Sequence, residues 1–339
     1  MRVLQVMASG RHGGAELFYE DLVPALVKAG TEQVGVIRPY PERAAILAKA
    51  GCPVTMLKFG GPLDLVTRFK LAKIAKAAKP DIAMGWMNRA CKDLPKGPWV
   101  NVGRLGGYYD LKYYRRCTHL ICNTPDICDY VVREGRAAAA VHYIPNFCPV
   151  RDEPAVDRAL LGGQAAPVLL ILARLHPAKG IDIALRALVE IKDAVLWIAG
   201  EGPAEGKLKQ LAADLGLGGR VRFLGWRDDR SALLKAADVC LLPSRSEPFG
   251  NVVLNAWSHG VPLVACASQG PGKLVHDGDD GLLAPVDDAG ALAAQVNAIL
   301  KDRALAQRLV AGGRQRTAAA FSEAAVVERY LAVYRAILA

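Results

Sequence analysis

The stretch "ILARLHPAKGIDIALRAL" (residues 171–188) reads as an apolar strand, a turn and an amphipathic helix in immediate succession. Arg174 closes the strand-like run, and Lys179 stands directly before Gly180, where the helix is expected to begin. A buried strand that leads through a short turn into a helix is the repeating unit of α/β proteins. This segment therefore predicts an α/β fold, with its two cations at the carboxyl end of a strand.

The same alternation extends outward in both directions. Short β-rich runs recur from "RVLQVMA" to "VHYIPN", pause at a polar stretch rich in Pro and Gly near 147–166, and restart with "VLLILAR". Strands this apolar are buried on both faces, as in parallel sheets covered by helices. We expect two Rossmann-like domains that face each other across a ligand-binding cleft, at 1–150 and 151–320. A C-terminal helix is expected at 321–339, with Ser322 at its start, and it could pack back on the first domain.

The composition is that of a well-buried globular protein. Of 339 residues, 52% are hydrophobic and 22% charged, and no apolar run reaches the roughly 20 residues of a membrane helix. The N-terminal segment lacks the features of a signal peptide, so a cytoplasmic protein is expected. The eight Cys are scattered through apolar runs, without metal-ligand spacing, which favours reduced core thiols and no metal site.

Positive charge is concentrated in the first half of the chain. The net charge is +10, and residues 1–155 carry 22 Lys+Arg against 14 Asp+Glu. Within this half, Lys70, Lys73, Lys76 and Lys79 recur at helical spacing. Two interpretations stay open for these lysines: the solvated face of a surface helix, or a stripe that meets anionic lipid headgroups at the inner face of the membrane. No basic motif with interleaved aromatic residues points to nucleic acid.

The first strand ends in the glycine-rich turn "ASGRHGGAELFYEDL" (8–22). Gly13 and Gly14 allow a tight turn and a close approach to a ligand before a helix that begins near Ala15. The spacing is not that of a dinucleotide fingerprint, and the second strand ends in "VIRPY" without an acidic residue for a ribose. A dinucleotide-dependent dehydrogenase is therefore disfavoured.

A second turn-to-helix element, "SRSEPFGNVVLNAWSHG" (244–260), places a carboxylate before a helix. Gly250 lets the chain turn, and the first helical residues, Asn251 and Val252, belong to a turn whose N–H groups attract anions. Glu247 lies just before this turn. Cations, helix-end N–H groups and one carboxylate on the same sheet edge suit a nucleoside diphosphate joined to a hydroxyl-rich sugar.

At this point the chain resembles the retaining glycosyltransferases of family four, which have the GT-B fold. The resemblance spans nearly the whole sequence, and its motifs are "GGAE" (13–16), "YIPN" (143–146), "ARLHPAKG" (173–180), "IAGEGP" (198–203), "VRFLGW" (221–226) and "SEPFGNVVLNAWSHGVPLVA" (246–265). It implies that Glu247 contacts the transferred sugar and that Arg174 and Lys179 contact the donor diphosphate. Gly13 and Gly14 would lie beside the donor phosphates and the acceptor.

The resemblance also assigns the rest of the donor site. The base would be read after "VRFLG", around Gly225 and Trp226. In the family a second Glu follows the first after seven residues and grips the ribose, but this chain has Asn255 there. An amide can still bond a ribose hydroxyl without charge assistance, so the substitution puts donor affinity in question.

The acceptor side is less well defined by the sequence. Family members often place a His near the transferred sugar, whereas the corresponding strand end here, "NVGRLGGYYDLKYY" (101–114), has none. Arg104 could take an electrostatic role, bind an anionic acceptor, or be a buried structural residue. His12 and Tyr108 are the other acceptor-side candidates.

The resulting hypothesis is a retaining glycosyltransferase that needs no cofactor or metal. It would take a nucleotide sugar, UDP- rather than GDP-linked, and an acceptor hydroxyl of a glycan or glycolipid of the cell envelope, such as lipopolysaccharide. Two alternatives stay open. A nucleotide-sugar epimerase of the same fold would act on the donor alone, and a non-catalytic relative would bind without turnover.

Overall fold

A computed structural model describes residues 1–339 except 11–12, 62–63 and 164–165. The chain forms two compact units. Unit 1 comprises Met1–Phe147 together with Ser322–Ala339, and unit 2 comprises Cys148–Phe321. The C-terminal segment therefore belongs to the same unit as the N-terminus.

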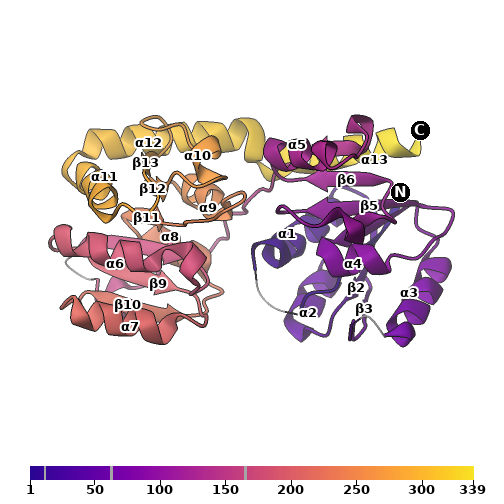
Figure 1. Cartoon of the computed structure of the whole chain (residues 1–339), viewed down its shortest axis with the longest axis horizontal. Coiled ribbons are helices and arrows are strands. Elements are labelled where there is room, and N and C mark those ends of the chain that lie inside the picture. Colours follow the sequence, from indigo (N-terminus) through magenta and orange to yellow (C-terminus); the bar gives the residue numbers. More distant parts are fainter. Residues whose placement is uncertain (11–12, 62–63, 164–165) are drawn as a thin grey trace. The chain divides into compact units, whose positions relative to one another are not determined.

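Unit 1 is built on a parallel sheet with the strand order β3-β2-β1-β4-β5-β6-β7 (Figure 1). Its strands are β1 (Arg2–Met7), β2 (Glu32–Ile37), β3 (Val54–Met56), β4 (Ile82–Trp86), β5 (Val100–Leu105), β6 (His119–Cys122) and β7 (Val141–Tyr143). The order reverses beside β1, because β2 lies on one side of it and β4 on the other. Loops after β1 and β4 therefore emerge side by side at the carboxyl edge of the sheet.

Helices cover both faces of this sheet. They are α1 (Gly14–Lys28), α2 (Pro41–Lys49), α3 (Leu65–Ala78), α4 (Met87–Asp93), α5 (Pro125–Arg133) and α13 (Glu323–Leu338), with short 3₁₀ turns η1 (Leu111–Tyr114) and η2 (Ala138–Ala140). Side chains of α1 and α13 pack with Val3 and Met7 of β1, while those of α3, α4 and α5 pack with Leu4 and Val6. Alternate residues of a buried strand thus serve opposite helix layers.

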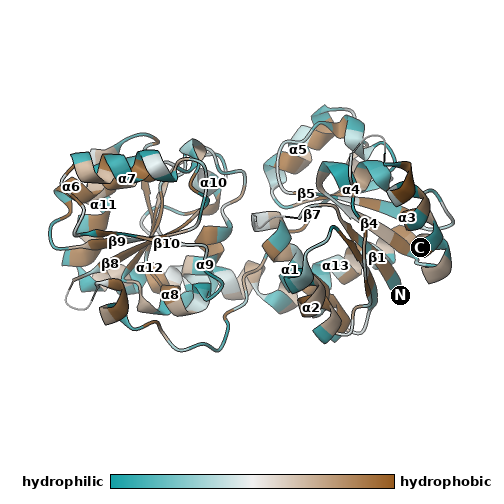
Figure 2. Ribbon diagram, turned by 90° about the horizontal axis from the view of Figure 1, so that it is seen from below, coloured by the Kyte–Doolittle hydropathy of each residue, from teal (hydrophilic) through white to brown (hydrophobic). Residues whose placement is uncertain are grey.

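Unit 2 repeats the design with the strand order β10-β9-β8-β11-β12-β13. Its strands are β8 (Val168–Leu172), β9 (Val195–Ala199), β10 (Val221–Gly225), β11 (Val239–Leu242), β12 (Leu263–Cys266) and β13 (Leu282–Ala284). Its helices are α6 (Ile181–Glu190), α7 (Glu205–Asp214), α8 (Arg230–Ala236), α9 (Asn251–His259), α10 (Pro271–Leu274), α11 (Ala289–Lys301) and α12 (Arg303–Arg316), with the turns η3 (Arg158–Leu161), η4 (Pro177–Lys179) and η5 (Thr317–Phe321). In both units the strands are mainly hydrophobic, and the helices carry hydrophilic residues as well (Figure 2).

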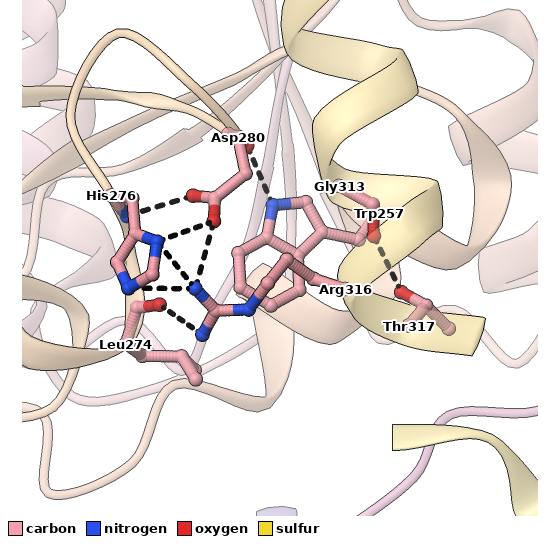
Figure 3. Close-up of polar contacts among 7 residues, drawn as sticks. All are labelled: Trp257, Leu274, His276, Asp280, Gly313, Arg316 and Thr317. Atoms are coloured by element: carbon pink, nitrogen blue, oxygen red, sulfur yellow. Dashed lines mark hydrogen bonds and ion pairs between the residues drawn. The ribbon is translucent and has the colours of Figure 1, made fainter. Parts of the chain in front are cut away.

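A buried contact fixes α9 against α12 (Figure 3). The Trp257 indole N–H donates to the Asp280 carbonyl at 2.6 Å, and the Arg316 guanidinium lies over the indole ring, 5.4 Å from its centre. Arg316 also bonds the Asp280 carboxylate at 3.2 Å. Gly313 passes so close that a Cβ there would stand 2.3 Å from Trp257 Cδ1. The C-terminal half of α9, the helix that follows Gly250, is therefore fixed against α12.

The predicted fold class is confirmed. Both units are parallel sheets wrapped by helices, and the C-terminal helix packs into the core of unit 1, where Val326, Tyr330 and Tyr334 are fully buried. All eight cysteines are free thiols, six of them buried. In the described parts of the chain, no helix is long and apolar enough to cross a membrane.

We expect Gly313→Ala to lower the free energy of unfolding by about 1–3 kcal/mol, because the added methyl group must displace the Trp257 ring. The matched control is Gly206→Ala in α7, where a Cβ meets nothing within 4 Å. There the better helix propensity of Ala should stabilise the protein by up to about 1 kcal/mol. Urea unfolding measures the free energy of unfolding of both variants. Equal changes in Gly313→Ala and Gly206→Ala would show that the Trp257 contact does not constrain α9.

Candidate functional site

Two loops meet at the carboxyl edge of the second sheet, because β8 and β11 are neighbouring strands. The loop after β8 leads into α6 through Gly180, whose φ is +61°. A Cβ at Gly180 would stand 1.9 Å from the Pro243 carbonyl oxygen in the loop after β11, so no other residue fits. The N–H groups of Arg245 and Ser246 donate to the Ala178 carbonyl at 2.9 and 3.1 Å. The two loops are thus joined along their backbones.

This junction brings Lys179 and Glu247 together. Lys179 Nζ lies 2.6 Å from Glu247 Oε2, and the side chains are 21% and 18% exposed. The Glu247 backbone is fixed as well, since its carbonyl accepts from the Gly270 N–H at 2.7 Å and its N–H donates to Gln269 Oε1 at 3.3 Å. The ion pair is only partly buried, so a ligand can reach it, and the carboxylate extends from a backbone that is held at both its N–H and its carbonyl.

Arg174 differs from Lys179 in its surroundings. Its side chain is exposed, and its guanidinium makes no hydrogen bond or ion pair within the described chain. One of the two predicted cations is therefore paired with the predicted carboxylate, and the other is available to an anion.

Arg245 is a site-supporting residue that the sequence analysis missed. It forms a two-pronged pair with Asp182 in the first turn of α6, at 2.7 and 2.6 Å, and a further bond to Asp287 at 2.5 Å. Burial raises the pKa of the Asp182 carboxyl, but the hydrogen bonds and charge of Arg245 outweigh this effect and lower it overall. A cation two residues before Glu247 was visible in the sequence, whereas its distant partners were not.

The N-terminus of α9 follows directly after Glu247. Gly250 precedes the helix with φ +99° and, as a glycine, has no side chain with which to cap the first turn. Asn251 and Val252, the first two helical residues, are half-buried. A helix N-terminus that begins four residues after Glu247, the partner of Lys179, gives this edge an affinity for phosphate oxygens.

Asn255 is buried in unit 2. Its side chain is 6% exposed, its amide oxygen accepts from the Cys148 thiol at 2.6 Å, and its amide nitrogen donates to the Asn251 carbonyl at 3.0 Å. The amide thus links the start of unit 2 to α9. A role toward ribose stays a prediction.

Gly225 and Trp226 mark the end of β10, at the other side of this sheet edge. Gly225 has φ +64°, and its carbonyl accepts from the Gly200 N–H at 2.7 Å. The Trp226 backbone N–H donates to Glu201 at 3.3 Å, and its indole donates to Asp228 at 2.8 Å. The ring is half-buried and held at both ends, so a flat partner could stack on it.

On unit 1, the predicted residues fall at the carboxyl edge of the first sheet. Gly13 precedes α1 in an extended conformation, and Gly14 is the first helical residue. Tyr108 is 45% exposed and packs edge-on against Tyr130. His12 lies outside the described residues.

Arg104 is enclosed in the core of unit 1. It is 3% exposed and donates to the Tyr330 hydroxyl of α13, to the Leu105 carbonyl and to Asn146. Its guanidinium also lies over the rings of Phe18 and Trp86. These contacts favour the structural interpretation of Arg104, and a role toward an acceptor stays a prediction.

No group of three or more His, Cys, Asp or Glu side chains is arranged to hold a metal ion among the described residues.

Comparison with known proteins identifies the family to which the chain belongs. A family model for glycosyl transferases group 1 matches residues 157–316. The chain is 36% identical to the lipopolysaccharide core biosynthesis glycosyltransferase LpsE of Rhizobium meliloti (strain 1021), over 95% of this chain and 96% of that protein. It is 33% identical to LpsD of the same strain, which has the same description, over 96% of both chains.

Among solved structures, Anabaena HepE in complex with UDP-glucose has a similar fold. The TM-score is 0.87 at 22% sequence identity, with 99% of this chain and 100% of that chain covered.

The Arg245–Asp182 pair predicts a pH dependence of stability. Because the folded-state pKa of Asp182 is lowered, its contribution is complete above the ordinary Asp pKa of about 3.9 and is lost as the pH falls through the folded-state value. Asp182→Asn should therefore lower the urea midpoint at pH 7, and the difference from wild type should shrink toward pH 3. The exposed Asp152→Asn serves as the control, and a difference independent of pH would contradict the assignment.

Proposed function

The chain belongs to the group 1 glycosyltransferases, and on that premise we propose that it moves a sugar from UDP to a hydroxyl of a cell-envelope glycan or glycolipid, with retention of configuration. It is an enzyme with two Rossmann-like domains, and the donor is proposed to bind at the carboxyl edge of sheet β10-β9-β8-β11-β12-β13.

The observation that carries this proposal is the Lys179–Glu247 ion pair, in which Glu247 lies just before the N-terminus of α9 in the loop after β11. A diphosphate placed against the helix end would compete with Glu247 for Lys179. Glu247 would then be free to accept hydrogen bonds from hydroxyls of the attached sugar. Exposed Arg174 would supply the second cation. Binding of the donor would thus break the Lys179–Glu247 ion pair. Lys179 would then pair with the diphosphate, and Glu247 would accept from the sugar hydroxyls.

The proposed reaction breaks the bond between the anomeric carbon and the diphosphate oxygen. Negative charge then develops on the leaving diphosphate, where Lys179, Arg174 and the helix end stabilise it. The acceptor oxygen forms the new bond on the same face, and its proton passes to the departing phosphate oxygen. In this scheme no protein nucleophile is needed, and Glu247 orients the sugar as positive charge grows on its ring.

Asn255 is proposed to act indirectly on the donor. Its amide is bonded to Cys148 and to the Asn251 carbonyl, so it fixes the first turn of α9 from behind. Any contact of this amide with a ribose hydroxyl would lack the charge assistance that a carboxylate gives. We infer that affinity for the nucleotide depends chiefly on the phosphates.

The donor and acceptor classes are inferred from similar proteins. HepE binds UDP-glucose, which supports a UDP-linked donor. LpsE and LpsD are named for lipopolysaccharide core biosynthesis, which supports an acceptor in the cell envelope.

Glu247→Gln should test the proposal most directly. It keeps the shape but removes the charge next to the sugar, so turnover should fall on the order of 100-fold. The affinity for UDP should be unchanged or tighter, because Lys179 loses its competing partner. Sugar transfer from UDP-sugars and calorimetric titration with UDP provide the two measurements.

Substitution of the two cations, Arg174 and Lys179, tests the proposed contacts with the diphosphate. Arg174→Ala or Lys179→Ala should weaken UDP binding by roughly 10- to 100-fold, and exposed Arg308→Ala should leave it unchanged. If Glu247→Gln kept full turnover, or if Arg174→Ala bound UDP like wild type, the donor site would lie elsewhere.

Helix α3 is proposed to bring the enzyme to an anionic membrane surface. Leu65, Val66 and Phe69 are 68%, 64% and 74% exposed. At 100° per residue, these side chains and exposed Lys70, Lys73 and Lys76 fall within an arc of about 140°. The opposite side of the helix packs on the unit through Thr67, Leu71 and Ala75. Apolar side chains followed by lysines on one outward face suit lipid headgroups above an acyl boundary.

Changing Lys70, Lys73 and Lys76 to Gln should reduce sedimentation with phosphatidylglycerol vesicles by tenfold or more, since each lysine contributes about 1 kcal/mol near such a surface. Lys192, Lys207 and Lys301 of unit 2 are also exposed, so their triple change to Gln is a control of equal charge. An equal loss of vesicle sedimentation in the two triple variants would indicate a general charge effect. Helix α3 would then be an ordinary solvated surface helix.

A further inference from the structure

The loop between β12 and α10 binds the backbone of Glu247. Because β12 lies beside β11, the loops that follow these two strands meet at the carboxyl edge of the second sheet. The Gly270 N–H donates to the Glu247 carbonyl at 2.7 Å, and the Glu247 N–H donates to Gln269 Oε1 at 3.3 Å. A Cβ at Gly270 would stand 2.7 Å from the same carbonyl oxygen, so this approach requires a glycine. Gln269 therefore lies next to the residue that is proposed to bind the transferred sugar.

The orientation of the Gln269 amide follows from this contact. The backbone N–H of Glu247 can only donate, so the amide oxygen faces it and the amide nitrogen is left for another partner. That nitrogen makes no hydrogen bond to any described residue, and residues 166–339 are described without a gap. The side chain is exposed. Gln269 therefore offers its amide N–H groups to a ligand while its oxygen stays bound to the loop that carries Glu247.

The backbone around Gln269 is fixed on both sides. Ser268 is buried, its N–H donates to the Cys266 carbonyl at 2.7 Å, and its carbonyl accepts from the Gly272 N–H at 2.8 Å. Gly270 is buried as well. An exposed Gln side chain normally loses conformational entropy when it is ordered, but here the loop and the bond to Glu247 already restrict it. A ligand that meets the amide would therefore lose little affinity to the ordering of this side chain.

A hydroxyl group bound by Glu247 needs a second partner. A hydroxyl both donates and accepts, whereas a carboxylate only accepts, so the oxygen of that hydroxyl still requires a donor. The two cations of this edge are assigned to the diphosphate. The Asn255 amide nitrogen already donates to the Asn251 carbonyl at 3.0 Å. The Gln269 amide nitrogen is a neutral donor next to Glu247 that no described residue engages.

A carboxylate and an amide N–H together distinguish a hydroxyl from other groups of similar size. An ammonium group would pair with Glu247 but would turn its own N–H groups toward the amide donors of Gln269. A carbonyl or carboxylate oxygen would accept from Gln269 but would not donate to Glu247. A carbon without the hydroxyl would leave both residues without a partner, which costs affinity. The two residues are therefore selective for a hydroxyl.

We propose that Gln269 is a specificity-determining residue of the donor site, and that its amide nitrogen donates to the same sugar hydroxyl that donates to Glu247. This inference rests on the proposed function and adds the class of donor: the transferred sugar carries a free hydroxyl at the position that faces Glu247. Sugars that are deoxy or amino at that position are disfavoured.

The test measures binding of UDP, UDP-glucose and UDP-galactose to the full chain by calorimetric titration. The UDP-sugar that binds more tightly is then compared with its 2-, 3-, 4- and 6-deoxy analogues. In wild type, one deoxygenation should weaken binding on the order of 100-fold, because a charge-assisted and a neutral hydrogen bond are both lost. In Gln269→Met the same deoxygenation should cost about 3- to 10-fold less, since only the bond to Glu247 remains to be lost. The affinity for UDP should not change. The control is Gln307→Met, at an exposed Gln of α12.

A second variant, Gln269→Glu, separates recognition of the sugar from support of the Glu247 backbone. Its carboxylate can still accept from the Glu247 N–H, but it has no N–H to donate. The dependence on the sugar hydroxyl should therefore fall as it does in Gln269→Met. If Gln269→Glu kept the wild-type dependence while Gln269→Met lost it, Gln269 would act only by holding the Glu247 backbone, and the inference would be wrong.

The outcomes are distinguishable from those of the proposed function. Wild-type binding that is insensitive to every deoxygenation, or equal costs of deoxygenation in wild type and in Gln269→Met, would overturn the inference while leaving the site for the diphosphate intact. Failure of wild type to bind UDP would instead overturn the proposed donor site.

Discussion

The proposed donor-binding edge of unit 2 depends on one close approach of two backbones. Gly180 lies against the Pro243 carbonyl. The Ala178 carbonyl accepts hydrogen bonds from the N–H groups of Arg245 and Ser246. A side chain at position 180 would push the loops apart and separate Lys179 from Glu247, which are 68 residues apart in sequence. Since β8 and β11 are neighbouring strands, the sheet delivers both loops to one place, and the glycine lets them touch.

The fold and much of this edge could be read from the sequence, for a physical reason. Strands buried on both faces are apolar throughout, and helices that follow them begin at glycine turns, so both signals are local. Arg174, Lys179 and Glu247 could be placed at strand ends on this basis. Partnerships between distant segments could not. The pairing of Arg245 with Asp182 and the bond between Cys148 and Asn255 depend on tertiary packing that no short pattern records.

The two units treat buried charge in different ways. In unit 2, Lys179 and Glu247 neutralise each other near the surface, where a ligand can exchange with either. In unit 1, the buried Arg104 bonds neutral oxygens and lies over aromatic rings, and no carboxylate of the described residues pairs with it.

The return of α13 to unit 1 has a consequence for synthesis on the ribosome. The Tyr330 hydroxyl accepts a hydrogen bond from Arg104, and apolar side chains of α13 help to cover one face of the first sheet, yet all of them are translated after unit 2. Until they emerge, the first 147 residues expose an apolar surface and a half-solvated guanidinium, while unit 2 can already close its own core. The first unit can therefore complete its core only after unit 2 has been translated.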